Sequence, residues 1–98
     1  MFLTTIPGVM VGSAASLATI GTATAAVNVA AAVPTMSPPP PAIDPVSALL
    51  SIGLGVHGGT YQAVGLVSNL INQMFAGSIV GGSVMYDVTN AANTALLT

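Results

Sequence analysis

The sequence contains no lysine, no arginine, no cysteine and no tryptophan among its 98 residues. Nucleic-acid binding depends on Lys and Arg side chains that neutralise phosphates, so the sequence excludes this class of function. The same absence removes electrostatic attraction to anionic lipid head groups. Without Cys there is no disulfide framework, no thiolate nucleophile and no zinc–thiolate site.

Charge of either sign is almost missing, because Asp44 and Asp87 are the only acidic residues and the net charge is −2. A typical soluble domain carries roughly 25% charged residues. This chain has 2% and is 53% hydrophobic. Such a surface has little to oppose self-association, and a chain of this length supports only a modest core. We therefore expect one small domain that needs a partner to cover its apolar surface.

The N-terminal region runs from apolar to small residues and reaches Ala23-Thr24-Ala25, which imitates a signal-peptide cleavage site. A secretory signal begins with a positively charged segment, which this region lacks. Pro7 and Gly8 also lie where the apolar segment should begin. We therefore do not expect a cleaved signal peptide.

The strongest break in the chain is a proline-rich turn predicted over residues 34–44. Four consecutive prolines at 38–41 are incompatible with a helix and favour an extended link. Asp44 is the predicted N-cap of the next helix, and Pro45 suits its first position because that N–H would be unpaired anyway. We predict this second helix over residues 45–80, with Gly81-Gly82 ending it and residues 81–98 forming a partly helical tail.

The first helix is predicted over residues 7–33, which are rich in alanine. It should end at Val33, because the residue before a proline is disfavoured in helical geometry. Thr5 is its predicted N-cap. Two helices joined by a proline-rich turn predict an all-α, antiparallel two-helix hairpin.

The predicted second helix is apolar on two faces, with apolar residues spaced by three and four positions, so it should contact two neighbours. A lone hairpin leaves half of each apolar stripe exposed. We therefore expect a second protein to cover it. The candidate partner interface consists of Leu50, Val64, Val67, Ile71, Met74 and Phe75.

Several short stretches occur together in a specific order and spacing. They are Asp44-Pro45-Val46-Ser47-Ala48-Leu49, Tyr61-Gln62-Ala63-Val64, Met74-Phe75, and Tyr86 followed by Asn90-Ala91-Ala92-Asn93. In this respect the chain resembles the PE proteins of mycobacteria along essentially its whole length. The first stretch is similar to the family's Asp-x-Val-Ser-Ala-Leu. The Pro-Glu pair that gives the family its name is Pro7-Gly8 here.

The resemblance implies a single PE-type domain over residues 1–98 that pairs with a PPE-family protein to complete a four-helix-type bundle. It also implies a cytosolic stage in which a secretion chaperone binds the PPE partner. A type VII secretion system would then export the pair to the cell envelope, the cell surface or the outside. The family's tail signal is Tyr-x-x-x-Asp/Glu, in which Tyr86 fits and Asn90 replaces the acidic residue.

We expect no catalytic, metal or cofactor site. His57 has no Cys, Glu or second His near it, so a metal site there would lack ligands. The sequence has no Gly-x-Ser-x-Gly nucleophile elbow, and a bare hairpin offers no pocket. We interpret the chain as a non-enzymatic interaction protein.

The alternative is a membrane-embedded hairpin or a small pore component of the cell envelope. Two segments are long enough to cross a bilayer, which takes about 20 residues each. Against this, Ala, Gly, Ser and Thr provide little insertion energy, and Asn69, Asn72 and Gln73 interrupt the second segment. The two interpretations do not exclude each other, so membrane association stays open.

Overall fold

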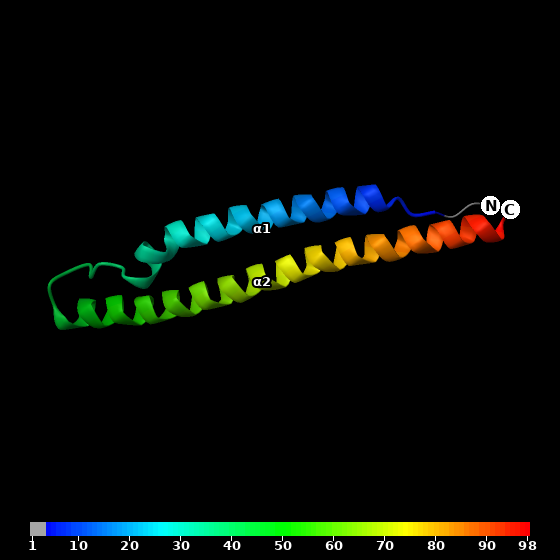
Figure 1. The fold of residues 1–98 in the computed structure, drawn as a ribbon. Coiled ribbons are helices and arrows are strands. Elements are labelled where there is room, and N and C mark those ends of the chain that lie inside the picture. The colour runs from blue at the N-terminus through cyan, green and yellow to red at the C-terminus, as the bar shows by residue number, and fades with distance from the viewer. Residues whose placement is uncertain (1–3) are drawn as a thin grey trace. The chain divides into compact units, whose positions relative to one another are not determined.

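The structure is a computed structural model that describes residues 4–98. The regular secondary structure in this range consists of two helices. Helix α1 spans Pro7–Met36 and helix α2 spans Pro45–Leu96, with residues 37–44 linking them (Figure 1). The described residues contain no strand. The prediction of an all-α chain with two long helices is therefore confirmed, and the arrangement is consistent with a helical hairpin.

Contacts between the helices fall into two compact units. The turn unit spans Thr22–Leu70, and the terminal unit combines the described residues up to Gly21 with Ile71–Thr98. In each unit a segment of α1 lies beside a segment of α2 that runs in the opposite direction (Figure 1). Because both helices contribute to both units, the prediction of a single domain over residues 1–98 is left as a prediction.

In the turn unit, the side chains between the helices are small or polar. On α2, the less exposed positions recur every three or four residues, at Ser51, Gly55, Gly58, Gln62, Gly65 and Asn69. On α1 they are Ala25, Asn28, Ala31, Ala32 and Thr35. Gln62 Nε2 donates to Thr35 Oγ1 at 3.3 Å, and Ser51 Oγ donates to the Pro38 carbonyl. This contact is therefore built from backbone approach and hydrogen bonds rather than from large apolar side chains.

Two glycines allow the backbones of the turn unit to come close. A Cβ atom at Gly55 would lie 2.6 Å from the Met36 carbonyl oxygen. A Cβ atom at Gly58 would meet the Thr35 carbonyl oxygen even more closely. Since the obstructing atoms belong to the backbone, no side-chain movement can relieve these contacts. The end of α1 can pack on α2 here only because both α2 residues lack a side chain.

The terminal unit follows the same pattern. Its least exposed apolar residues are Ala14 on α1, at 3%, and Ala76 on α2, at 6%, and the hydroxyl residue Ser83 is 2% exposed. Asn72 Nδ2 donates to the Leu17 carbonyl at 3.1 Å. Small residues again hold the helices together, and a side-chain amide supplies the directional contact.

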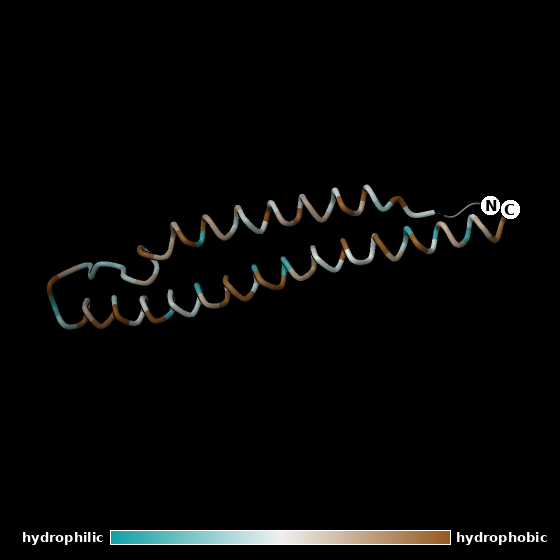
Figure 2. Tube along the Cα trace, viewed as in Figure 1, coloured by the Kyte–Doolittle hydropathy of each residue, from teal (hydrophilic) through white to brown (hydrophobic). Residues whose placement is uncertain are grey.

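The large apolar side chains lie on the outer faces of both helices. Apolar residues extend along both helices and are interrupted by only a few hydrophilic positions (Figure 2). Among the described residues, no large side chain is fully buried. The exposed area is 7177 Å², whereas a compact monomer of this mass exposes about 5,000 Å² by size scaling. The fold thus leaves its hydrophobic surface largely uncovered.

The predicted end of the second helix at Gly81-Gly82 is wrong, because α2 continues to Leu96 and includes most of the predicted tail. Glycine costs a helix roughly 1 kcal/mol relative to alanine, which packing can override. Here Gly82 lies against Met10, whose Cε atom would be 3.8 Å from an added Cβ. The neighbouring buried Ser83 donates to the Val80 carbonyl at 2.6 Å. Packing against α1 therefore stabilises the helical conformation of Gly81 and Gly82, and α2 continues past them.

The predicted end of the first helix at Val33 is also wrong, because α1 continues to Met36 with Pro34 inside it. Proline removes the helical hydrogen bond to the carbonyl four residues earlier, but it does not break the helix here. Thr35 Oγ1 donates to the Ala31 carbonyl at 2.7 Å, and the Ser37 N–H donates to the Val33 carbonyl at 3.0 Å. These bonds satisfy carbonyls at the end of the helix, and the proline-rich link is correspondingly shorter than predicted.

The glycine contact in the turn unit gives a first testable prediction. Gly58→Ala should destabilise the fold by about 1–3 kcal/mol, because overpacking against a backbone carbonyl outweighs the gain in helix propensity. Gly59→Ala is the matched control, since a Cβ at Gly59 has nothing within 4 Å. The Gly59→Ala substitution should leave the free energy of unfolding unchanged or raise it slightly. Thermal melts followed by far-UV circular dichroism measure both, and equal melting temperatures would contradict the packing role of Gly58.

Candidate interaction surface

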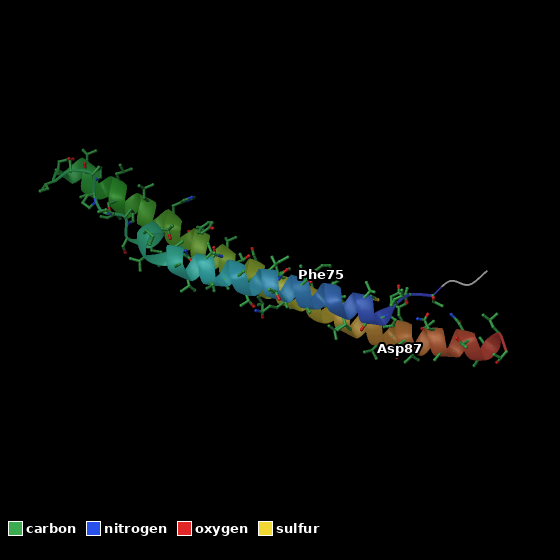
Figure 3. The ribbon with its side chains drawn as sticks, turned by 90° about the horizontal axis from the view of Figure 1, so that it is seen from above. Phe75 and Asp87 are labelled. Carbon is green, nitrogen blue, oxygen red and sulfur yellow. The ribbon has the colours of Figure 1, made fainter. Side chains whose placement is uncertain are left out.

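The six residues predicted to contact a partner are all exposed. Their exposed fractions lie between 51% and 65%. Leu50, Val64 and Val67 belong to the turn unit, and Ile71, Met74 and Phe75 to the terminal unit. Phe75 lies in the C-terminal half of α2 (Figure 3). Each of the six is more than half exposed, so each unit offers apolar side chains that remain available. Their role in a partner interface stays a prediction.

Sequence reasoning missed the positions between the helices. It followed only the apolar residues of the second helix. Instead, the repeat of Gly55, Gly58, Gln62 and Gly65 marks the contact with α1. The signal was present as small and polar residues spaced by three and four positions, the same spacing that was read for the apolar ones.

The start of α2 is capped by Asp44. Its Oδ1 accepts from the Ser47 backbone N–H at 2.9 Å, and its Oδ2 accepts from Ser47 Oγ at 2.7 Å. Pro45 takes the first helical position, where a missing N–H costs nothing. The Ser47 backbone N–H, assisted by the Ser47 hydroxyl, holds the pKa of the Asp44 carboxyl below its ordinary value of 3.8. One of the chain's two acidic residues, Asp44, thus acts as a helix cap.

Thr5 does not cap α1 as predicted. The helix begins at Pro7, so Ile6 takes the cap position, and the Ile6 carbonyl accepts from the N–H groups of Val9 and Met10. Thr5 Oγ1 is buried and has no hydrogen-bond partner among the described residues. Thr5 lies one residue too early for its hydroxyl to act as a cap. Its backbone carbonyl instead bonds to the far end of the chain.

The tail residues differ in their environments. Tyr86 is 47% exposed and the adjacent Asp87 is also exposed, whereas Asn90 is half-buried. Asn90 Nδ2 donates to the Thr5 carbonyl at 2.8 Å. The two residues are 85 positions apart in the sequence, so sequence reasoning could not find this contact. The role of Tyr86 and Asn90 in a secretion signal is a prediction that the geometry leaves open.

His57 lies beside a groove of about 420 Å³ in the turn unit. The groove is formed by Leu54, His57 and Tyr61 of α2 with Pro34 and Thr35 of α1. Over residues 4–98, no group of three His, Cys, Asp or Glu side chains could hold a metal ion. The titratable side chains in the lining of the groove are the imidazole of His57 and the phenol of Tyr61.

Both helices are long and apolar enough to cross a membrane by length and composition. Their most apolar windows have mean hydropathies of 1.5 in α1 and 1.4 in α2, and only 6% of each window is buried. The buried core helix of a soluble protein can pass the same test, but these windows are not buried. Exposed apolar surface of this extent is typical of protein–protein or membrane interaction sites.

Together these features define a class of protein: a small all-α chain that presents exposed apolar helix faces. The family model of the PE family matches residues 3–93. This chain therefore belongs to the PE family. The predicted resemblance is confirmed.

Three relatives from Mycobacterium tuberculosis illustrate the family. The PE family protein PE8 is 39% identical over 93 residues, which is 95% of this chain and 34% of PE8. The PE family protein PE13 is 35% identical over 94 residues, which is 96% of this chain and 95% of PE13. The uncharacterized PE-PGRS family protein PE_PGRS34 is 38% identical over 96 residues, or 98% of this chain and 19% of that protein.

The chain thus spans about a third of PE8 and nearly all of PE13. None of the three names includes a catalytic activity. No solved structure matches the chain.

The Asp44 cap gives a second prediction, on pH. Because the folded-state pKa is lowered, the ionised cap contributes fully above its ordinary pKa of 3.8 and loses this contribution as pH falls through the lowered value. Asp44→Ala should lower the melting temperature at neutral pH. Asp44→Asn should largely keep it, because Asn caps about as well and does not titrate.

Circular dichroism melts of the three proteins from pH 7 to pH 2 test this. The wild type should approach the alanine variant only below pH 3.8, and Asp44→Asn should show less acid loss than the wild type. Identical pH profiles for the wild type and Asp44→Asn would exclude a contribution from the carboxylate.

Proposed function

We propose that this PE-family chain is a non-enzymatic interaction subunit that forms a heterodimer with a PPE-family protein. The observation that carries the proposal is the placement of its large apolar side chains on outer faces, while small and polar residues hold the helices together. The partner would supply further helices and complete a four-helix-type bundle. Family membership supports this choice of partner.

The energetics favour a stable complex over a free hairpin. Fully burying one Val, Leu, Ile, Met or Phe side chain contributes roughly 1.5–3 kcal/mol. Covering the six candidate interface residues from their observed exposure would contribute on the order of 5–10 kcal/mol before the cost of association. A standard interface removes about 800 Å² from each partner. The surface in excess of a compact monomer is large enough for such an interface.

The proposal includes export of the assembled pair. A secretion chaperone would bind the PPE partner in the cytosol, and a type VII secretion system would then deliver the pair to the cell envelope or outside. Two observations support a signal at this position: Tyr86 is exposed, and it lies in the C-terminal part of α2. The acidic position of the signal is held by Asn90, which is half-buried.

A second candidate function is a membrane-embedded hairpin or small pore component of the cell envelope. One observation favours it: Asn72 donates to the Leu17 carbonyl and Gln62 to Thr35, so both point at α1 instead of outward. Asn69 also lies on the less exposed face. Polar side chains that bond between helices are tolerated in membranes. The objection that polar residues interrupt the second segment therefore applies mainly to the exposed Gln73.

Co-expression separates the two functions and gives a third prediction. With a suitable PPE-family protein chosen from a panel, the chain should become soluble without detergent and co-purify as a 1:1 complex. Val67→Asp should reduce the recovered complex at least about tenfold, because it would bury an unpaired charge. Leu97→Asp is the control, since Leu97 is 70% exposed and lies outside the candidate interface. Extraction by detergent alone, with every PPE protein, would favour the membrane function.

A fourth prediction concerns export. Tyr86→Ala should leave the complex assembled, because Tyr86 is exposed and not part of the candidate interface. Secretion of the pair should fall about tenfold or more when the culture filtrate is compared with the cell lysate. Tyr61→Ala, which removes the other tyrosine at a similarly exposed site, serves as the control. Normal secretion of Tyr86→Ala would argue against a tyrosine-based tail signal.

A further inference from the structure

In the terminal unit, one side-chain hydrogen bond joins the two ends of the described chain. Asn90 Nδ2 donates to the Thr5 carbonyl at 2.8 Å, and both residues are half-buried. The bond fastens the residues just before α1 to the last turns of α2. The side-chain amide of Asn90 is therefore engaged in a hydrogen bond within the protein.

The bond requires a side chain that donates a hydrogen, which the Asn90 amide does. An ionised carboxylate only accepts hydrogen bonds, so Asp or Glu at position 90 would place negative oxygen against the Thr5 carbonyl oxygen. Such an acid would lose the bond and would favour release of the N-terminal segment. Asn is thus not merely a neutral substitute for an acid at this position, because its donor group has a partner.

The free carboxylate of the tail is Asp87. It is exposed and has no hydrogen bond or ion pair among the described residues, and the chain contains no Lys or Arg to neutralise it. The other acidic residue, Asp44, is engaged with Ser47. Asp87 lies in the C-terminal half of α2 and directly follows the exposed Tyr86 (Figure 3). Tyr86 and Asp87 therefore present an exposed phenol and an exposed carboxylate at consecutive positions of α2.

We propose that Asn90 latches the N-terminal segment onto α2, and that the tail is recognised through Tyr86 and Asp87 rather than through position 90. The recognising surface would combine an apolar slot for the ring with an Arg or Lys side chain for the carboxylate. Charge complementarity supports a cationic receptor, because Asp87 has no cation within its own chain. This inference rests on the proposed export function and assigns the residues that would carry its recognition.

The latch is tested by hydrogen exchange in the assembled complex. Asn90→Asp should raise the exchange rates of the Val9 and Met10 amides, which bond to the Ile6 carbonyl at the start of α1, by about tenfold. Asn93→Asp adds the same charge three residues later at an exposed position and should leave these rates unchanged. Equal rates in the two variants would overturn the latch.

Recognition is tested by secretion of Asp87→Asn, with Asn90→Ala and Tyr86→Ala measured in parallel. Asp87→Asn should reduce secretion about as strongly as Tyr86→Ala, without lowering the melting temperature of the complex. Asn90→Ala should be secreted close to the wild-type level, because it removes only the latch. Asp87→Glu should restore part of the secretion by keeping the charge.

The outcomes distinguish this inference from the function on which it rests. If Tyr86→Ala is blocked while Asp87→Asn is secreted normally, the assignment of Asp87 is overturned and the export function stands. If Asn90→Asp is secreted better than the wild type, the secretion machinery contacts position 90 itself. The assignment of recognition to Tyr86 and Asp87 is then overturned as well. If both Tyr86→Ala and Asp87→Asn are secreted normally, the tail signal and the inference fail together.

Discussion

The close approach of the two helix backbones is the constraint on which the rest of the structure depends. At Gly58 the contact leaves no room for a Cβ atom beside the Thr35 carbonyl. In the terminal unit, Ala14 and Ala76 fill the space between the helices. Large side chains cannot lie between helices packed this closely. They are therefore directed outward, and the apolar surface of the chain becomes an external one.

Hydrogen bonds take over part of the role that a hydrophobic core has in larger proteins. Amide side chains such as Gln62, Asn72 and Asn90 each reach the opposite segment. A typical bond of this kind adds only about 0.5–1.5 kcal/mol of net stability, but it is directional. It therefore fixes the register of the helices within each unit more than it stabilises them. Under the proposed function, burial of the outer faces by a partner would supply further stabilisation.

This division of roles is compatible with the unusual composition. A chain in which 2% of the residues are charged has a surface poorly suited to water, yet this surface suits an interface in which little charge has to be desolvated. The single carboxylate without a partner in the fold, Asp87, lies away from the candidate interface and next to Tyr86. An isolated charge on such a surface is well placed to serve as a specific contact.

The sequence predicted some features well because they depend on local chemistry. The proline run excluded a helix at 38–41, and the family motifs were readable as short stretches with fixed spacing. Its errors occurred where tertiary contacts outweighed local preference. Gly81-Gly82 is a weak helix segment by propensity, but Gly82 packs on Met10 and α2 continues. Pro34 was expected to end α1, but the helix continues to Met36, and Thr35 and Ser37 bond to carbonyls of its last turn.

The sequence by itself determined that the chain is all-α, that it belongs to the PE family and that its surface is almost uncharged. These properties depend on composition, residue spacing and short motifs, which need no knowledge of contacts. Only the tertiary structure decided which stripe of α2 meets α1 and what Asn90 does. Apolar periodicity shows that a helix has faces, but it does not show which face is inside. The face of α2 that packs on α1 is determined by the close backbone approach at the glycines. It is also determined by hydrogen bonds between residues as distant in sequence as Thr5 and Asn90.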